Sequence, residues 1–260
     1  MARIAITGAE GNIGRILLDR LEGHDITALT RSSYDDIDST SLDITDRDRF
    51  TTVLADHDVL IHLAANSSPY AEWDDLWEPN INGTYNAYYA AVENDLDRVI
   101  YASSNHAVNM ADIDSPTEPE TMSPDAPTVY PETPPRPDSL YGTTKVACEG
   151  LGAYFAKRYD LEVVNFRIGW FMTPEQLEAT QRDSDSPHPE DAKRFARAMF
   201  LSHRDCVHGI TRAIEAPIDE SPLTVHAISR NDDRYLSITH TQRTLGYQPR
   251  DNATEILEER

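Results

Sequence analysis

Residues 3–14 read Arg-Ile-Ala-Ile-Thr-Gly-Ala-Glu-Gly-Asn-Ile-Gly, and this stretch decides the fold of the chain. Arg3–Thr7 is a short apolar run that ends at a glycine, which is typical of a buried strand in a parallel sheet. Beyond the glycines, apolar residues recur at helical spacing from Ile13 to Leu21. The order of strand, glycine turn and helix predicts the start of a βαβ unit.

The same alternation continues along the chain. Apolar runs predict strands at 24–30, 59–65, 98–103 and 162–168, and helical patterns predict helices at 46–56, 84–94 and 140–159. Because such alternation implies parallel strands joined by crossover helices, we expect an α/β fold. Residues 1–168 are predicted to form a Rossmann-type doubly wound parallel sheet with helices on both faces. Residues 169–260 are predicted to form a small mixed α/β subdomain packed on it.

Residues 112–138 interrupt this alternation. Eight of the sixteen prolines fall there, so an extended loop is predicted rather than a helix or a central strand. The α/β pattern resumes at Leu140, which favours a surface loop or a lid over a linker between domains. The aspartate-rich stretch 183–191 is expected to be solvated surface.

The charge balance excludes two classes of partner. The formal net charge is −22 at pH 7, from 23 Lys and Arg against 45 Asp and Glu. Such a surface repels nucleic acid and anionic membranes. Because 39% of the residues are hydrophobic and clearly periodic, disorder does not explain the acidity. A cytoplasmic protein of a halophile is favoured, since carboxylates hold water in concentrated salt; an acidic mesophilic protein is the alternative.

Membrane segments and metal sites are not expected. No apolar run approaches the length needed to span a bilayer. Cys148 and Cys206 are spaced unlike zinc ligands. His203, Cys206 and His208 do not share one helical face, so a metal site there is not predicted either.

The three glycines at positions 8, 11 and 14 predict a dinucleotide site. Glycine permits a tight turn, close approach of the backbone to a pyrophosphate, and close packing of the helix on the strand. Asn12 and Ile13 open the helix, whose unpaired N–H groups and positive dipole favour phosphates. We therefore expect NAD or NADP as the cofactor.

Arg31 bears on the choice between the two cofactors. NAD sites place an acid near this point, at the end of the second strand, to bind the ribose 2′-hydroxyl. Arg31 is instead followed by Ser32 and Ser33, a set that suits a 2′-phosphate and slightly favours NADP. The alternative is an Arg31 that faces solvent, with Asp35 or Asp36 serving the ribose.

A candidate catalytic pair lies on the helix predicted at 140–159. Tyr141 and Lys145 are four residues apart and share one helical face. A free tyrosine keeps its proton until about pH 10, and a cation one turn away favours the phenolate that a base requires. Ser104 and Asn105 follow a buried strand, so they would reach the same edge of the sheet, where they bind substrate or simply cap the strand.

These motifs together resemble the extended short-chain dehydrogenase/reductase superfamily, the NAD-dependent epimerase/dehydratase family. The matching segments are Gly8-x-x-Gly11-x-x-Gly14, His62-Leu63-Ala64-Ala65, Asn80-x-x-Gly83-Thr84 and Tyr141-x-x-x-Lys145. Ser103-Ser104-Asn105-His106, Arg136-Pro137-Asp138-Ser139-Leu140-Tyr141-Gly142, Arg167-Ile168-Gly169 and Leu245-Gly246-Tyr247-Gln248-Pro249 look more narrowly like uronate dehydrogenases and haloarchaeal glucose-6-phosphate dehydrogenase.

The resemblance implies an NAD(P)-dependent oxidoreductase that oxidises C1 of a cyclic sugar to the lactone. Tyr141 would take the hydroxyl proton, Lys145 would tune Tyr141 and bind the nicotinamide ribose, and Ser104 or Asn105 would hold the substrate oxygen. Further implied cofactor contacts are Asp43, Ile44, Leu63, Ala64, Ala65, Asn80 and Ile168. Implied substrate contacts are Ser67, Ser104, Asn105, His106, Tyr141, Arg194 and Arg197.

Three departures from the uronate enzymes leave the substrate open. Arg31 stands where they have aspartate. Their carboxylate-binding arginine would fall near Phe195, between Arg194 and Arg197. Trp170 stands where a serine is usual.

Other functions on the same fold stay open. A nucleotide-sugar epimerase or dehydratase with tightly bound NAD is the main alternative, although fewer residues follow Ile168 than such enzymes need. A non-catalytic sensor is disfavoured by the intact Tyr141 and Lys145. The resemblance also implies a homodimer formed through the helix that carries Tyr141.

Overall fold

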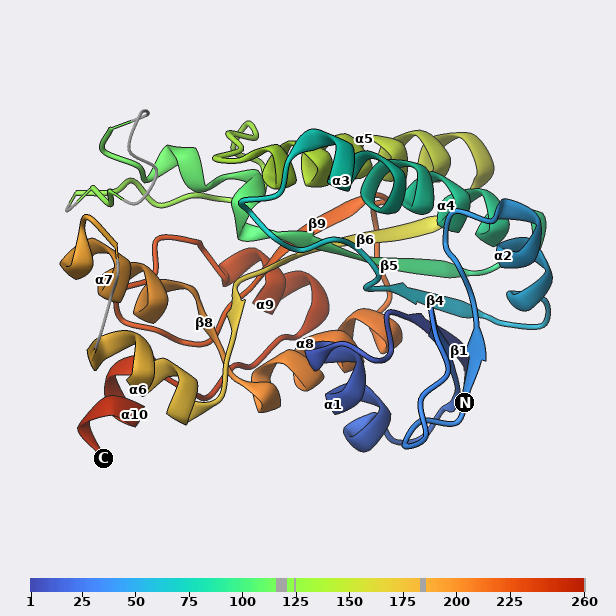
Figure 1. The fold of residues 1–260 in the computed structure, drawn as a ribbon, viewed down its shortest axis with the longest axis horizontal. Helices are drawn as coiled ribbons and strands as arrows, with labels where there is room; N and C mark the ends of the chain where they lie inside the picture. The colour runs from blue at the N-terminus through green and yellow to red at the C-terminus, as the bar shows by residue number, and fades with distance from the viewer. Residues whose placement is uncertain (116–120, 124, 183–185, 260) are drawn as a thin grey trace.

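The central element is a parallel sheet of seven strands in the order β3-β2-β1-β4-β5-β6-β9 (Figure 1). A computed structural model describes residues 1–115, 121–123, 125–182 and 186–259. The strands are β1 (Arg3–Thr7), β2 (Asp25–Thr30), β3 (Ser39–Ser41), β4 (Val59–His62), β5 (Arg98–Ser104), β6 (Glu162–Ile168) and β9 (Leu223–Ala227). The chain runs outward from β1 to β3 and then returns to β4 on the other side of β1. This reversal places a crevice at the carboxyl ends of β1 and β4.

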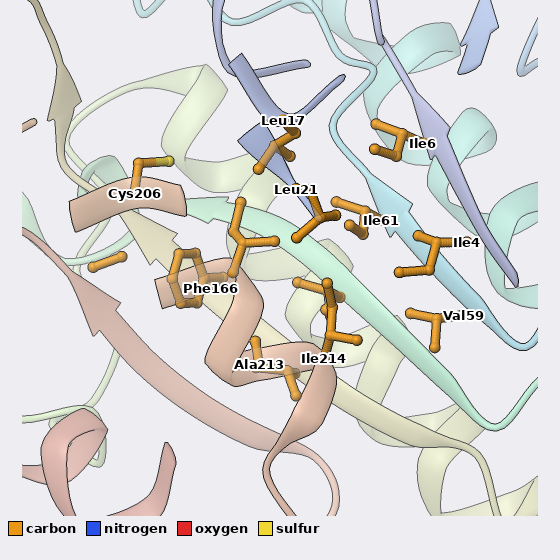
Figure 2. Packing of buried hydrophobic residues seen from close by; sticks show 14 of the residues in the cluster. Ile4, Ile6, Leu17, Leu21, Val59, Ile61, Phe166, Cys206, Ala213 and Ile214 are labelled. Carbon is orange, nitrogen blue, oxygen red and sulfur yellow. The ribbon is translucent and has the colours of Figure 1, made fainter. Parts of the chain in front are cut away.

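Alternate residues of the strands form two separate cores. Ile4 and Ile6 of β1 point to one face of the sheet, where they join Val59 and Ile61 of β4 in one cluster (Figure 2). Ala5 points to the other face, into a cluster with Leu60, Phe50 and Tyr88. Because both faces are covered, β1 and β4 carry apolar residues at successive positions, which is why the sequence shows continuous runs there.

Helices cover both faces of the sheet. α1 (Asn12–Arg20) and α8 (His203–Glu215) pack together on one face. α2 (Arg47–Val53), α4 (Gly83–Glu93) and α5 (Leu140–Tyr159) lie on the other (Figure 1). The short helix α3 (Trp73–Leu76) and a π-helical turn, Trp77–Asn82, lead into α4. The predicted Rossmann-type doubly wound fold is confirmed.

The chain beyond β6 forms a small second sheet with its helices and also supplies the last strand of the main sheet. β7 (Trp170–Phe171) and β8 (Phe200–Leu201) form a small two-stranded sheet beside α6 (Pro174–Arg182), α7 (Pro189–Met199) and α10 (Ala253–Glu258). β9, in contrast, pairs with β6 at the edge of the main sheet and is followed by α9 (Thr239–Leu245). The two parts that were predicted to divide at residue 168 thus share one sheet. A separate substrate subdomain stays a prediction.

Several predicted boundaries need correction. The strand predicted at 59–65 ends at His62, and residues 63–65 form a loop at the crevice. The helix predicted at 46–56 is shorter, Arg47–Val53. The predicted loop 112–138 contains no helix or strand in its described residues, and a bridge joins Val129 to Leu236. Residues 116–120 and 124 of that loop, and 183–185 of the acidic stretch, lie outside the described residues.

Candidate active site

The glycine loop is built so closely that side chains do not fit. Gly8 has a φ of +66°, and a Cβ there would lie 2.9 Å from the backbone nitrogen of Ala64. A Cβ on Gly14 would lie 2.5 Å from the carbonyl oxygen of Gly8. Gly11 precedes helix α1 and provides no side-chain cap for its first N–H groups. The loop therefore offers a backbone cradle and helix N–H groups to a phosphate, as predicted from the sequence.

A cavity of about 1470 Å³ follows the carboxyl edge of the sheet from this loop to α7. Small-molecule sites usually measure about 300–1,000 Å³, so this one has room for a dinucleotide and a sugar together. Its wall includes all but one of the predicted cofactor contacts: Gly8, Gly11, Asn12, Ile13, Gly14, Arg31, Asp43, Ile44, Leu63, Ala64, Ala65, Tyr141, Lys145 and Ile168.

Asn80 is the predicted cofactor contact that does not line the cavity. Its side chain is buried and is used by the protein itself. Oδ1 accepts from the backbone N–H of Asn66 at 2.8 Å, and Nδ2 donates to the Asn66 carbonyl and to the Thr144 hydroxyl at 3.0 and 3.1 Å. Asn80 therefore fixes the loop after β4 against helix α5, and shapes the cavity wall from behind.

Tyr141 and Lys145 lie side by side on the cavity wall. Both belong to the first turns of α5, and both are almost fully buried. The Lys145 Nζ donates to the carbonyl of Ala102 at 2.7 Å and lies 5.4 Å from the centre of the Tyr141 ring. One of three ammonium protons is thus used at the end of β5, which leaves the others for a ligand.

The start of α5 explains why Tyr141 is placed so firmly. Ser139 caps the helix, because its hydroxyl accepts from the N–H of Gly142 at 3.0 Å. Gly142 lies directly against the segment that follows β5, since a Cβ there would be 2.2 Å from the His106 carbonyl oxygen. Only glycine permits this approach, so the tyrosine is held against the residues of the β5 end.

Ser104 and Asn105 occupy the end of β5 and the short 3-10 turn Asn105–Ala107. The Ser104 hydroxyl accepts from the N–H of His106 at 3.2 Å and donates to the Asn105 side-chain oxygen at 3.1 Å. Both residues line the cavity. The structure thus brings both near Tyr141, and which one contacts substrate stays open.

His106 belongs to a polar network that the sequence alone did not reveal. Its ring meets the Tyr141 ring edge-on at 5.7 Å, and its Nδ1 lies 2.9 Å from the Asp138 carboxylate. Asn109 Nδ2 donates to the same carboxylate at 3.0 Å, and the Tyr235 hydroxyl donates to Asn109 Oδ1 at 2.7 Å. The Asp138 carboxylate fixes the His106 ring. The sequence could have indicated this role, because Asp138 stands beside Ser139 in the segment that leads to Tyr141.

The remaining predicted substrate contacts divide into two groups. Ser67 lines the cavity. Arg194 and Arg197 do not: Arg194 donates to the carbonyls of Met122 and Ser123 at 2.6 Å each, and Arg197 pairs with Asp233 at 2.6 Å. Both guanidinium groups hold the surrounding loops. Phe195, which lies between them in the sequence, faces the cavity beside Trp170, with ring centres 6.3 Å apart.

The adenosine end of the cavity is marked by Arg31. Its side chain is exposed and lines the cavity. Asp36, one of the two acids considered for the ribose, is paired with Arg15, and this pairing holds the pKa of Asp36 below its usual value. Neither Asp35 nor Asp36 belongs to the cavity wall.

His62 supports the loop after β4 from beneath. Its ring is buried between the hydroxyls of Thr7 and Thr84, at 2.8 and 3.3 Å. Burial, and to a lesser extent the Lys145 ammonium, lowers the pKa of His62 to about 3. The ring is therefore neutral at neutral pH, and its hydrogen bonds link strand β1 to helix α4.

The residues fit a bound dinucleotide, because the glycine cradle has no room for side chains and opens into the cavity. In the described part of the chain, no group of three His, Cys, Asp or Glu residues could hold a metal ion. His203 is stacked on Phe171, with ring centres 4.3 Å apart, and Cys206 is buried. Among the described residues no helix is long and apolar enough to cross a membrane.

A dinucleotide loop and a tyrosine–lysine pair on one cavity of a doubly wound sheet define the class of extended short-chain dehydrogenases/reductases. The model of the NAD dependent epimerase/dehydratase family matches residues 4–218, and the chain belongs to this family. The resemblance inferred from the sequence motifs is confirmed.

Three relatives match almost the whole chain. It is 48% identical to L-arabinose 1-dehydrogenase (NAD(P)(+)) of Haloferax volcanii, over 99% of this chain and 100% of that one. It is 35% identical to NAD-dependent glucose-6-phosphate dehydrogenase of the same organism, over 97% and 95% of the two chains. A mutant uronate dehydrogenase from Agrobacterium tumefaciens, solved in complex with NAD, matches with a TM-score of 0.80 at 26% identity, over 100% and 88%.

Proposed function

We propose that the chain is an NAD(P)-dependent sugar dehydrogenase that oxidises C1 of a cyclic sugar to the lactone. The observation that carries this proposal is the place of Tyr141 and Lys145, in one cavity with the glycine loop. The names of all three relatives agree, since each is a dehydrogenase of a sugar or sugar derivative.

In this reaction Tyr141 acts as the base. Its phenolate oxygen takes the proton of the C1 hydroxyl, while the hydrogen on C1 leaves with its electron pair and the C1–O bond becomes a carbonyl. The bound cofactor supplies the hydride acceptor. The Lys145 ammonium, held by the Ala102 carbonyl, stabilises the phenolate and is placed to bind the nicotinamide ribose. Ser104 or Asn105 donates to the substrate oxygen.

For the cofactor, we propose use of both forms with some preference for NADP. Arg31 lies at the adenosine end of the cavity, where a guanidinium can bind a 2′-phosphate by two charge-assisted hydrogen bonds. Asp36 is paired with Arg15, which argues against its serving the ribose hydroxyl. The Haloferax relative is named for both cofactors.

For the substrate, we propose a neutral aldose, with L-arabinose as the first candidate. The relative at 48% identity is named for that sugar. Arg194 and Arg197, the arginines expected to bind an acid group, are held by loop carbonyls and Asp233 instead. The end of the cavity near Trp170 therefore offers no arginine from the described residues to a carboxylate or phosphate.

We also propose a homodimer and a high-salt environment. Tyr154 and Tyr159 on α5 are about half exposed, and their rings meet edge-on with centres 6.1 Å apart, as a helix surface covered by a second copy would explain. The net charge of −22 suits concentrated salt, as does the similarity to two Haloferax proteins.

The test is a reduction assay in concentrated KCl. Purified protein is given NAD or NADP with L-arabinose, D-glucose, D-glucuronate or glucose 6-phosphate, and reduced nicotinamide is followed by absorbance. Reduction with L-arabinose is expected. Absence of reduction with every sugar, together with release of a nucleotide from the denatured protein, would overturn the proposal in favour of an epimerase or dehydratase.

A further inference from the structure

Asp112 is fixed at the point where the proline-rich loop leaves the body of the protein and returns to it. It follows the 3-10 turn Asn109–Ala111, and its N–H donates to the Asn109 carbonyl at 2.9 Å. Its own carbonyl accepts from the N–H of Ser123 at 2.8 Å. The backbone of Asp112 is therefore held from both sides of the loop, and its side chain has a defined position.

The carboxyl group of Asp112 lies in the cavity wall and has no hydrogen-bond partner among the described residues. The residue is only 2% exposed, yet it lines the cavity. Its Oδ1 is buried and has no hydrogen bond, and no described residue donates to the other oxygen. Burying a carboxyl group without hydrogen-bond donors costs free energy. Such groups are therefore normally paired within the protein or accept a hydrogen bond from a ligand.

The neighbours of Asp112 leave this acid unpaired. Arg194 and Asp191 face it from α7, and Tyr235 faces it from the segment after β9. Arg194 is occupied by the carbonyls of Met122 and Ser123, and the Tyr235 hydroxyl donates to Asn109. Burial raises the pKa of Asp112 to about 7, the opposite of what a strong ion pair would produce.

Contacts connect Asp112 to the reacting end of the cavity. One 3-10 turn before it, Asn109 is bonded to the Asp138 carboxylate, which holds His106 against the Tyr141 ring. Asp112 thus extends the same polar wall away from Tyr141. Tyr141 and Asp112 line the same cavity, so we place the more distant ring hydroxyls of a sugar with C1 at Tyr141 on this part of the wall.

We infer that the Asp112 carboxyl group accepts a hydrogen bond from a ring hydroxyl of the sugar and thereby selects neutral sugars over sugar acids and sugar phosphates. The inference rests on the proposed function and adds the residue that sets its specificity. The pKa of Asp112 is raised to about 7, so the group is ionised above that pH. There a hydroxyl donor satisfies the unpaired oxygen, whereas a carboxylate or phosphate would bring a second acceptor against it.

The test compares Asp112→Asn with wild type and with Asp114→Asn, a matched change at an exposed position of the same loop. Steady-state rates with L-arabinose and with D-glucuronate, and calorimetric binding of both to enzyme saturated with reduced cofactor, are measured in concentrated KCl. For Asp112→Asn, the KM and the Kd for L-arabinose should rise about tenfold or more, since hydrogen bonds to charged groups are the strong ones. The value of kcat should stay within about threefold, and cofactor affinity should not change.

The ratio of kcat/KM for D-glucuronate over L-arabinose should also rise in Asp112→Asn and not in Asp114→Asn. An Asp112→Asn enzyme with unchanged KM, Kd and ratio would overturn the inference and leave the dehydrogenase intact. A wild-type enzyme that prefers D-glucuronate would overturn it as well. A wild type that neither oxidises nor binds any of these sugars would overturn both proposals.

Discussion

At the scale of single residues, the site depends on one hydroxyl group. Replacing Tyr141 by phenylalanine removes the oxygen that we propose takes the substrate proton, while the ring still packs edge-on against His106. We expect kcat to fall at least about a thousandfold, within the range of general-base effects, and the cofactor Kd to stay within about twofold. Tyr154→Phe, on the exposed side of the same helix, is the control and should keep full activity.

Kinetics with L-arabinose and fluorescence titration with reduced cofactor would check this expectation. Turnover close to wild type in Tyr141→Phe would contradict the role of Tyr141 as the base.

Arg31 supports a second prediction at this scale. Arg31→Asp should move cofactor preference toward NAD by about tenfold or more, since the variant loses a phosphate-binding fork and gains a partner for the ribose hydroxyl. The measurement is the ratio of kcat/KM for NADP to that for NAD. Arg49→Asp, which changes the same charge at an exposed site away from the cavity, should leave the ratio unchanged. An equal ratio in both variants would mean that Arg31 only faces solvent.

At the scale of elements, one buried ion pair joins helix α5, strand β6 and the proline-rich loop. Glu149 of α5 accepts two hydrogen bonds from Arg167 of β6, each of 2.8 Å, and one from the Ser103 hydroxyl at 2.6 Å. Arg167 also donates to the Pro131 carbonyl at 3.2 Å. The pair therefore links the helix of Tyr141 to the loop that begins at Asp112.

Breaking this pair should destabilise the protein strongly. Glu149→Ala leaves the guanidinium buried without its carboxylate, and we expect the free energy of unfolding to fall by about 3–5 kcal/mol. Guanidinium-induced unfolding followed by circular dichroism measures the change. Glu190→Ala removes an exposed pair with Lys193 and should destabilise the protein far less. Equal losses in the two variants would show that burial does not set the strength of the Glu149 pair.

The helices and strands also show which features of the fold can be predicted from local sequence. Helix α5 was predicted at its observed bounds, since Ser139 caps its start and its apolar pattern is continuous. The glycine loop and the pair Tyr141 and Lys145 were equally accessible, because local spacing alone defines them. Strand β3 was missed, since Ser39–Ser41 carries no apolar signal and is recognised only by its pairing with β2.

Contacts across long sequence separations were not predictable in the same way. Tyr235 and Asn109 meet although 126 positions separate them. Arg194 was expected to face substrate because of its place in the sequence, yet the carbonyls it binds belong to the proline-rich loop. Asp112 gave no local signal, because an aspartate at the start of a loop is normally solvated.

At the scale of the whole molecule, three buried titratable groups contribute to the response to acid. His62 and His226 have pKa values lowered to about 3 by burial, so each is neutral in the folded protein and protonated in the unfolded chain below about pH 6.5. Asp112, with its pKa raised to about 7, acts in the opposite direction. Between about pH 4.5 and 6.5, each histidine lowers the free energy of unfolding by about 1.4 kcal/mol per pH unit of acidification. Asp112 raises it by the same amount.

Together these three groups should lower the free energy of unfolding by about 1.4 kcal/mol for each unit between pH 6.5 and 4.5. The lowered pKa values of His203 and His208 add to this loss. Unfolding curves at fixed, concentrated KCl and stepped pH would measure it. Asp112→Asn should about double the slope, because the opposing group is gone. Asp114→Asn, at an exposed position of the same loop, is the matched control. A stability that is flat across this range would contradict the assignment of buried neutral histidines.

The position of β9 has a consequence for how the protein is made. This edge strand and Tyr235 come from near the end of the chain, while the glycine loop comes from its beginning. As the ribosome releases the chain, the dinucleotide cradle and the helix of Tyr141 emerge long before the residue that fastens Asn109 beside them. The cofactor half of the site is thus synthesised first and the sugar half is completed last. A prematurely terminated chain therefore contains the glycine loop and the helix of Tyr141 but lacks β9 and Tyr235.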